Sequence, residues 1–451
     1  MPNLSPTPAK EECDGSCSVF ELLARRTSYG GDRLVHDGAS GRCTGETRRF
    51  HNDNATLVQN LVSPGQFLRV QHGMTIKIAP TERIDWPPPY KDATEKYSSQ
   101  VRLTPDHRSL MGYVAGEPFP IIDANDPDAG SKVMWNVAFR PISSDEYDLR
   151  WFDCDSAYWG KNKSFNEIVD FEVGHYAGYN EVGRTEVNPI PIDPDFKETG
   201  RYFLSLLYPV LAPENARGTG LIKFRYANPN KEDASWTWTP GARRVRRLNY
   251  AILDTASGPQ AYDPNHYEGF SGKNENYDWK FIGDKNMLAA INVATVPDVR
   301  CPTDGGTSHC PDNWQVRHMY IIEGRPRPGK FNNSLYQREV MYIDAEADFV
   351  MSNDMYDRGG ELFNNYTSWM HYADRSEPGA RIAIYPFKRE FQVGSSTINI
   401  QSGFSTICYH PSMDAPSRDS WFINMGSVDR DWFTPESMAR AAEGGHANSG
   451  D

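Results

Sequence analysis

Short stretches that alternate apolar and polar residues recur along the chain, and they constrain its fold more than any other feature. In one of them, Ile222, Phe224 and Tyr226 oppose Lys223 and Arg225, which is the period expected of a strand with one buried face. Turn residues separate the stretches. The others lie at 202–208, 315–323, 337–344, 349–352, 381–387, 397–401 and 421–425. This spacing is typical of an antiparallel meander.

The first third of the chain gives weaker signals. Alternating apolar residues predict a strand over 133–140 and one or two strands over 67–78. A helix is predicted over 90–103, with Pro89 near its first turn. The chain shows no strand-helix-strand alternation, which argues against a doubly wound parallel sheet. A 12% aromatic content with 36 Gly and 32 Pro also favours short strands and turns. We therefore predict a mainly β (α+β) fold.

Three sections are predicted. Residues 1–80 form an irregular N-terminal extension with short helices, residues 81–435 form the antiparallel β domain, and residues 436–451 form a short helix and a frayed tail. We find no internal repeat and no low-complexity linker that would divide the chain further.

The charge of the chain excludes several partners. A net charge of -13 and a pI near 5.4 argue against nucleic acid as the main partner and against general adhesion to anionic membranes. The sequence has no run of eighteen apolar residues, so no membrane span is predicted. The N-terminus lacks the apolar region of a signal peptide. Either the protein is cytoplasmic or its signal has been removed.

The seven cysteines favour removal of a signal. They fit no metal pattern, since there is no Cys-x-x-Cys and no matching pair of histidines. Cys301 and Cys310 bracket a turn-rich loop that a disulfide would close, and Cys13 and Cys17 are similarly spaced, with Cys43 nearby. We interpret this as an oxidising compartment. Scattered reduced thiols are the alternative, and the odd count leaves at least one thiol without an intramolecular partner.

No catalytic signature is intact. The Gly-Phe-Ser-Gly sequence at 269–272 lacks a residue that the nucleophile elbow requires. The histidines are scattered, and those in predicted strands (His175, His318 and His371) are expected to be hydrogen-bonded core residues. The acidic stretch 123–130 is interpreted as an Asx-rich turn rather than a Ca²⁺ loop. We predict no metal, no cofactor and no catalytic residue, so a non-enzyme is favoured, although a triad recognised by geometry stays possible.

Segment 235–248 combines two tryptophans with four arginines. Trp236 and Trp238 are two positions apart, so a strand would place both rings on one face. A Pro-Gly turn follows, and then Arg243, Arg244, Arg246 and Arg247 surround Val245. Two interpretations stay open: a core wall with solvated arginines at its edge, or one side of a binding mouth for an apolar molecule with an anionic end.

Several short blocks carry a resemblance to a known family. They are Gly-Glu-Pro-Phe-Pro at 116–120, Met-Trp-Asn-Val at 134–137, and longer blocks at 267–272, 277–285, 317–324, 337–344 and 354–362. In this order they resemble a bacterial family of unknown function, described as outer-membrane-lipoprotein-sorting-like. That family is similar to the periplasmic lipoprotein carriers and outer-membrane receptors.

The resemblance implies a curved, incompletely closed antiparallel sheet, a half-open barrel, with a few helices covering or plugging an apolar cavity. It also implies a periplasmic carrier for a lipid or another hydrophobic molecule, working with a resistance-nodulation-type exporter and an outer-membrane protein. The alternative is an enzyme acting on a hydrophobic substrate in the same cavity. A third interpretation, a structural adaptor of an export complex, predicts no cavity.

The candidate ligand-binding residues come from segment 235–248 and the residues just after it, and from the blocks that carry the family resemblance. The candidates for the apolar lining are Trp236, Trp238, Tyr250, Trp279, Tyr320 and Tyr342, and the candidates for the rim are Arg243, Arg244, Arg246 and Arg247. For any one of these aromatic residues taken alone, ordinary core packing is a better explanation than contact with a ligand. Eight buried methylenes would contribute on the order of 6 kcal/mol before ordering costs, which is adequate for a micromolar carrier.

Overall fold

The computed structural model describes residues 49–50, 52–142, 144–159, 165–248, 261, 265–293, 300–301, 303–310, 313–329, 335–428 and 430–442. The described residues all belong to one compact unit of the chain, which begins at Arg49. The predicted pair Cys13 and Cys17, the candidate Tyr250 and the predicted tail beyond 442 lie outside the described residues.

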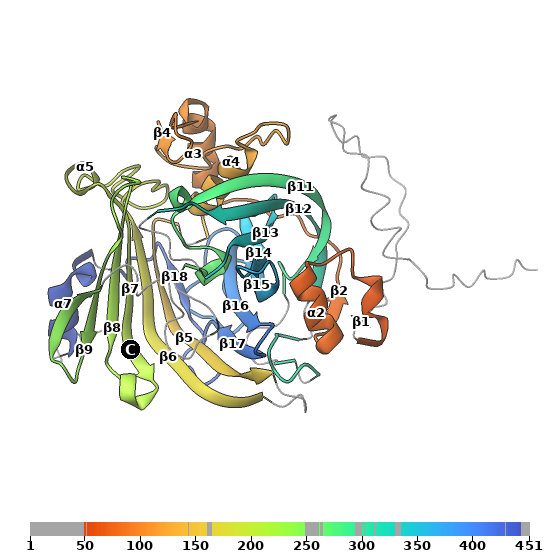
Figure 1. Ribbon diagram of the computed structural model, residues 1–451. Coiled ribbons are helices and arrows are strands. Elements are labelled where there is room, and N and C mark those ends of the chain that lie inside the picture. The colour runs from red at the N-terminus through yellow and green to blue at the C-terminus, as the bar shows by residue number, and fades with distance from the viewer. Residues whose placement is uncertain are drawn as a thin grey trace, which may run out of the picture. The chain divides into compact units, whose positions relative to one another are not determined.

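Two antiparallel meanders make up most of a sixteen-stranded sheet (Figure 1). The first comprises β5 (Glu146–Trp159), β6 (Phe165–Asn180), β7 (Arg201–Ala212), β8 (Gly220–Tyr226), β9 (Ala234–Thr239) and β10 (Arg244–Leu248). The second comprises β11 (Tyr277–Ala289), β12 (Asn313–Pro326), β13 (Arg338–Asp344), β14 (Phe349–Tyr356), β15 (Leu362–Ala373), β16 (Arg389–Asn399) and β17 (Phe404–Tyr409). Within each meander, every strand is antiparallel to the next.

The meanders meet where β17 pairs with β5, and there Cys408 lies directly opposite Cys154 and is bonded to it. Among the described residues the sheet does not close, because β10 at one end pairs only with β9 and β11 at the other pairs only with β12. Figure 1 shows the long strands curving. The prediction of a mainly β fold with a curved, half-open antiparallel sheet is confirmed.

Short strands extend this sheet. β18 (Trp421–Ile423) pairs with β5, and β1 (Arg49–Phe50) pairs with β2 (Ile76–Ile78). β2 runs parallel to β12, which makes the sheet mixed. β3 (Arg102–Leu103) and β4 (Leu110–Met111) form a separate pair.

Five α-helices accompany the sheet in the described part of the chain: α2 (Pro64–His72), α3 (Pro88–Tyr97), α4 (Ala129–Phe139), α5 (Phe196–Thr199) and α7 (Pro435–Ala442). We call the face covered by α4 and residues 265–276 the inner face; Val133 and Val137 of α4 pack there against Met341. We call the opposite face the outer face. It is covered by α2, whose Arg69 binds Asn365 and Ser396, and by α7, whose Met438 packs with Trp238.

The prediction of a strand over 133–140 is wrong, since this segment is the second half of α4. The helix is buried on nearly all sides, including Val133, Met134 and Trp135, and an unbroken apolar run does not distinguish a buried helix from a strand. Gly130 allows the helix to approach the sheet closely. A Cβ atom there would lie 2.8 Å from the backbone nitrogen of Lys280 in β11.

The prediction of strands over 67–78 is wrong for most of that range, because residues 64–72 form α2 and only 76–78 are extended. Ser63 and Gln66 form a capping box, in which each side chain accepts a hydrogen bond from the other residue's backbone N–H. This motif starts a helix, and it outweighs the alternation of apolar and polar residues in the segment.

Two further predicted elements differ from the structure. The helix predicted over 90–103 is shorter, because α3 ends at Tyr97. Residues 381–387 are not a strand, since the backbone N–H groups of Arg381, Ile382 and Ala383 all donate to the carboxylate of Asp419.

Loss of the junction disulfide is expected to destabilise the protein more than loss of the loop disulfide that joins Cys301 to Cys310. The first closes a separation of 254 residues and the second a separation of 9. The chain-entropy relation then gives about 5.5 and about 2.6 kcal/mol of stabilisation. Denaturant unfolding of C154A/C408A and C301A/C310A, each against the oxidised parent, measures the two losses. Equal losses, or a larger loss in C301A/C310A, would contradict this ranking.

Candidate functional site

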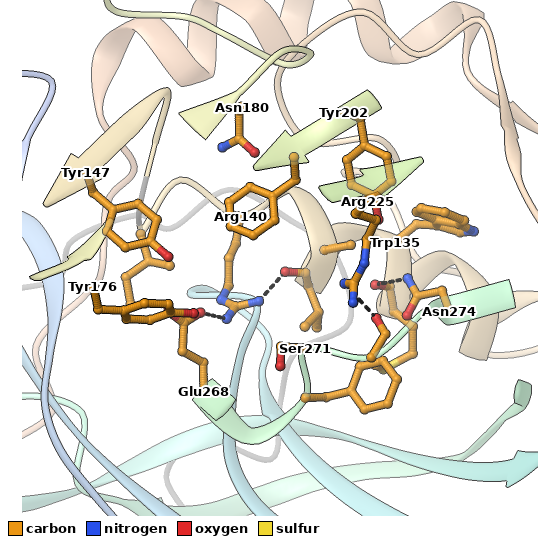
Figure 2. Close-up of a pocket in the computed structure, with 17 residues that line it drawn as sticks. Trp135, Arg140, Tyr147, Tyr176, Asn180, Tyr202, Arg225, Glu268, Ser271 and Asn274 are labelled. Atoms are coloured by element: carbon orange, nitrogen blue, oxygen red, sulfur yellow. Dashed lines mark hydrogen bonds and ion pairs between the residues drawn. The ribbon is translucent and has the colours of Figure 1, made fainter. Parts of the chain in front are cut away.

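A polar cavity of about 110 Å³ lies on the inner face, between α4, β5 to β8 and the segment 268–274 (Figure 2). Two arginines enter it from different elements: Arg140 follows the last residue of α4, and Arg225 lies on β8. Figure 2 shows their guanidinium groups on either side of Ser271.

Each arginine is neutralised by a buried carboxylate. Arg140 Nη2 lies 2.6 Å from Glu268 Oε2, and the two side chains are only 7% and 15% exposed. Arg225 Nε donates to Asp233 Oδ2 at 3.0 Å, and its Nη1 donates to the carbonyl of Gly272 at 3.1 Å. Because these pairs are buried to this extent, removing one partner would leave the other charge without compensation and would destabilise the fold.

Tyrosines complete the wall of the inner cavity. Burial raises the pKa of Tyr147 well above its usual value, and burial followed by the charge of Glu268 raises the pKa of Tyr176. Both phenols therefore stay protonated at neutral pH and act as hydrogen-bonding groups rather than as bases. With paired charges and a small volume, the inner cavity is a polar part of the core and offers little room for an apolar chain.

A second, larger cavity of about 280 Å³ lies on the outer face, between β5, β6, β7 and the C-terminal elements η6 (Arg430–Phe433) and α7. We call it the outer groove. Its lining is largely apolar and includes Trp151, His175, Leu206, Tyr208, Leu211, Trp432 and Met438. This composition, apolar walls with a few polar groups, is typical of sites for hydrophobic ligands.

Trp151 reaches the outer groove because the backbone of β5 inverts at this residue. Its φ of 57° is left-handed, which is unusual for a bulky side chain and carries conformational strain. Arg150 pairs with His175 and Phe152 with Val173, yet the Phe152 ring contacts Tyr176 on the inner face. The inversion therefore turns Trp151 outward and its successor inward.

The polar end of the groove is a short chain of ionic contacts. His175 Nδ1 lies 2.9 Å from Oδ1 of Asp148, and Arg150 Nε donates to Oδ2 of the same carboxylate at 2.8 Å. Asp148 is fully buried, whereas His175 is 15% exposed and packs edge-on against Trp432. Of these three residues, His175 is the one that lines the groove.

Among the predicted core histidines, His371 is half-buried and its Nδ1 lies 2.7 Å from the carbonyl of Val293. Burial lowers its pKa. His318 was expected to be a core residue as well, and that expectation is wrong. Its side chain is 48% exposed and pairs with Asp284 at 3.0 Å, because it points away from the core cluster that its neighbour Met319 enters.

The predicted lining residues do not meet in one cavity. Trp238 is buried and Trp236 is half-buried on the outer face of β9, both packed in the cluster that contains Phe433 and Met438. This cluster adjoins the outer groove through Met438, but neither tryptophan is among the groove's lining residues.

The remaining predicted aromatics pack in two other clusters. Trp279 lies under α4 against Tyr277, with its Nε1 donating to the carbonyl of Asn274 at 3.0 Å, and Tyr320 packs against the same cluster. Tyr342 belongs to a separate cluster with Phe349. Neither cavity is lined by these three residues.

The four predicted rim arginines are exposed at the end of the first meander. Arg243 lies in the turn, and Arg244, Arg246 and Arg247 lie on the edge strand β10. None of them forms an ion pair with a carboxylate of the described residues. They border neither the inner cavity nor the outer groove.

The residues that do line the groove were missed, except that His175 was noted as a histidine in a strand. Trp151 lies in a strand where the backbone inverts, and no residue type at this position, such as glycine, predicts that inversion. Trp432 and Met438 come from the C-terminal segment, more than 200 residues from β7. The alternation of apolar and polar residues predicts single strands, but it does not predict which distant segments pack against each other.

Comparison with known proteins identifies a family. Residues 50–439 match the family model described as "Protein of unknown function (DUF1329)", which confirms the resemblance seen in the sequence blocks. An uncharacterized protein of Pseudomonas aeruginosa is 22% identical over 338 residues, 69% of this chain and 66% of that protein. The matched region thus spans just under two thirds of that relative.

Two solved structures are similar at low identity. One is a putative outer membrane lipoprotein-sorting protein domain from Vibrio parahaemolyticus, with 14% identity, a TM-score of 0.45 and coverage of 70% of this chain and 100% of that one. The other is a DUF1329 family protein from Desulfovibrio piger, with 15% identity, a TM-score of 0.44 and the same coverage.

The Arg140–Glu268 pair gives a test of the inner cavity as part of the core. Arg140→Met leaves Glu268 buried without its partner, so the free energy of unfolding is expected to fall by about 3–5 kcal/mol. Removing both charges in R140M/E268Q is expected to restore a large part of that loss. Urea unfolding of the two variants measures the difference. A double variant no more stable than R140M would show that the pair is not what limits stability there.

Proposed function

We propose that this chain, which belongs to the DUF1329 family of proteins of unknown function, binds a lipid or another hydrophobic molecule in the outer groove and carries it. The single observation that carries the proposal is the apolar volume of about 280 Å³ between β7 and α7. The inner cavity is smaller and holds paired charges, which favours the outer face as the place of binding.

The energetics of the groove suit a carrier. An acyl chain or ring system leaving water gains roughly 25 cal/mol for each Å² of apolar surface buried. Eight methylenes held between Leu206, Tyr208 and Trp432 would gain on the order of 6 kcal/mol before ordering costs. This corresponds to binding in the micromolar range or weaker. Such affinity allows a carrier both to hold its ligand and to release it.

Release requires a cover that moves, and α7 has the properties of one. The helix is eight residues long, too short to be stable without its packing partners. Among the described residues, the hydroxyl of Ser437 donates to carbonyls of its own segment, those of Trp432 and Thr434. Among the described side chains of α7, those packed against the sheet cluster are apolar, namely Met438 and Ala439. Displacing α7 would open one side of the groove without breaking a strand.

Two disulfide bonds support an oxidising compartment, and we propose the periplasm. Cys154 is bonded to Cys408 and Cys301 to Cys310, and such bonds persist mainly outside the reducing cytosol. No helix in the described part of the chain is long and apolar enough to cross a membrane. A resistance-nodulation-type exporter and an outer-membrane protein as partners belong to the same proposal, and they rest on the family resemblance.

A groove-filling variant tests the proposal. Leu211→Trp places an indole in the groove, because Leu211 is a half-buried lining residue. The affinity for a dansyl-labelled undecanoic acid is expected to fall by about tenfold or more, since the indole occupies the volume of the chain. Fluorescence titration measures it. The matched control is Leu221→Trp, a half-buried leucine of β8 outside the groove, and it is expected to bind like the parent.

Native mass spectrometry with lipid extraction completes this test. A hydrophobic compound that co-purifies unchanged supports a carrier, whereas chemical conversion of the compound during incubation would establish an enzyme instead. A parent protein that is empty and also ignores the dansyl probe would rule out the groove as a binding site. Equal weakening in L211W and L221W would show that the probe binds elsewhere.

A further inference from the structure

A second site is suggested by carboxylates on the neighbouring strands β5 and β6. Asp153 and Asp155 are two positions apart and so share a face of β5. In the antiparallel register, Asp155 lies directly opposite Asp170, and Asp153 lies directly opposite Glu172. Four carboxylates thus form a square on adjacent strands, where like charges facing each other destabilise the pairing.

Three of the carboxylates converge on one point. An oxygen atom from each of Asp153, Asp155 and Asp170 lies within 4.8 Å of those of the other two. Asp153 and Asp155 are only 8% and 4% exposed, whereas Asp170 is exposed. The cluster is therefore buried on one side and reached from solvent on the other, an arrangement that allows an ion to enter.

Oδ1 of Asp153 marks the point where a partner is missing. This oxygen is buried and accepts no hydrogen bond from any described residue, although buried carboxylate oxygens are normally satisfied. The charge of Arg300 and a hydrogen bond from Ser412 also act on this carboxylate, but Oδ1 itself is left without a donor among the described residues.

Among the described residues, fewer cationic than acidic side chains surround the cluster. Arg300 forms an ion pair with Asp155. Arg217 lies near Glu172, but its guanidinium bonds Glu214 at 2.7 Å and is 58% exposed. The charge of Asp414 also acts on Asp170 and Glu172. Even with Arg300 bound, the cluster keeps an excess of negative charge.

We propose that Asp153, Asp155 and Asp170 bind a calcium ion, with Glu172 next to them as a further oxygen donor. The donor set contains only carboxylate oxygens, which select hard cations over zinc or copper. Ligands on opposite sides of a calcium ion are about 4.6–5.2 Å apart, given Ca–O distances of about 2.3–2.6 Å, so the observed separations fit such a shell. Water would complete the coordination.

The calcium ion would act as a cross-link between β5 and β6. Its place is close to the junction of the two meanders, because Asp153 also lies opposite Tyr409 of β17. The ion would replace repulsion between the strands with attraction at the point where the sheet is assembled. This role is independent of ligand binding in the outer groove, so either proposal can fail without the other.

Calcium titration of the chelator-treated full chain tests the site. Isothermal titration calorimetry is expected to show one Ca²⁺ bound per chain, and thermal unfolding is expected to shift to higher temperature with added Ca²⁺ because the ion binds the folded state. Asp170→Asn removes the exposed ligand with little change of shape. We expect its Ca²⁺ affinity to fall by roughly tenfold or more, since affinity follows the ligand charge count.

A matched control separates the site from general charge effects. Asp278→Asn removes an exposed strand carboxylate of β11 that is paired with Arg327, and its Ca²⁺ affinity is expected to equal that of the parent. Circular dichroism and the unfolding temperature in chelator establish that D170N is folded. A parent that binds no Ca²⁺, or D170N that binds it as tightly as the parent, would overturn the proposal.

Discussion

The pairing of β5 with β17 is the contact on which the rest of the sheet depends. Each meander pairs strands that follow one another along the chain, but this pair joins strands that are about 250 residues apart. The junction is secured by the Cys154–Cys408 bond and by a 2.7 Å hydrogen bond between Ser156 and Thr406. Since loop closure over such a separation is entropically costly, a covalent link there stabilises more than it would within either meander.

The same strand β5 also explains where the candidate sites lie. Before Trp151, its outer face carries Asp148, which holds the polar end of the outer groove. The inversion at Trp151 adds one more outward side chain, and after it Asp153 and Asp155 occupy the outer face, where Arg300 meets them. One left-handed residue therefore separates a largely apolar groove from an acidic cluster along a single strand. A regular strand would have turned Trp151 to the inner face and left the groove without that wall.

The fold class could be predicted from the sequence because a strand with one buried face alternates apolar and polar residues, as Ile222, Phe224 and Tyr226 do with the residues between them. The same reasoning failed for α4, because a helix buried on nearly all sides leaves no polar face from which to read a period of 3.6. It also placed Trp236 and Trp238 correctly on one face of one strand, since both join the same cluster. What covers that face is decided by α7, about 200 residues later, and alternation carries no information about such a partner.

The two faces of the sheet differ in what opening them would cost. Moving α4 would expose a helix buried on nearly all sides and would separate Arg140 from Glu268, leaving charges that are only 7% and 15% exposed without partners. Breaking such a pair costs several kcal/mol. Moving α7 would expose Met438 and a few apolar neighbours, at roughly 1.5–3 kcal/mol for each fully buried side chain. A ligand in the groove would replace part of those lost contacts. Exchange through the outer face is therefore the less costly route for the ligand binding proposed in the outer groove.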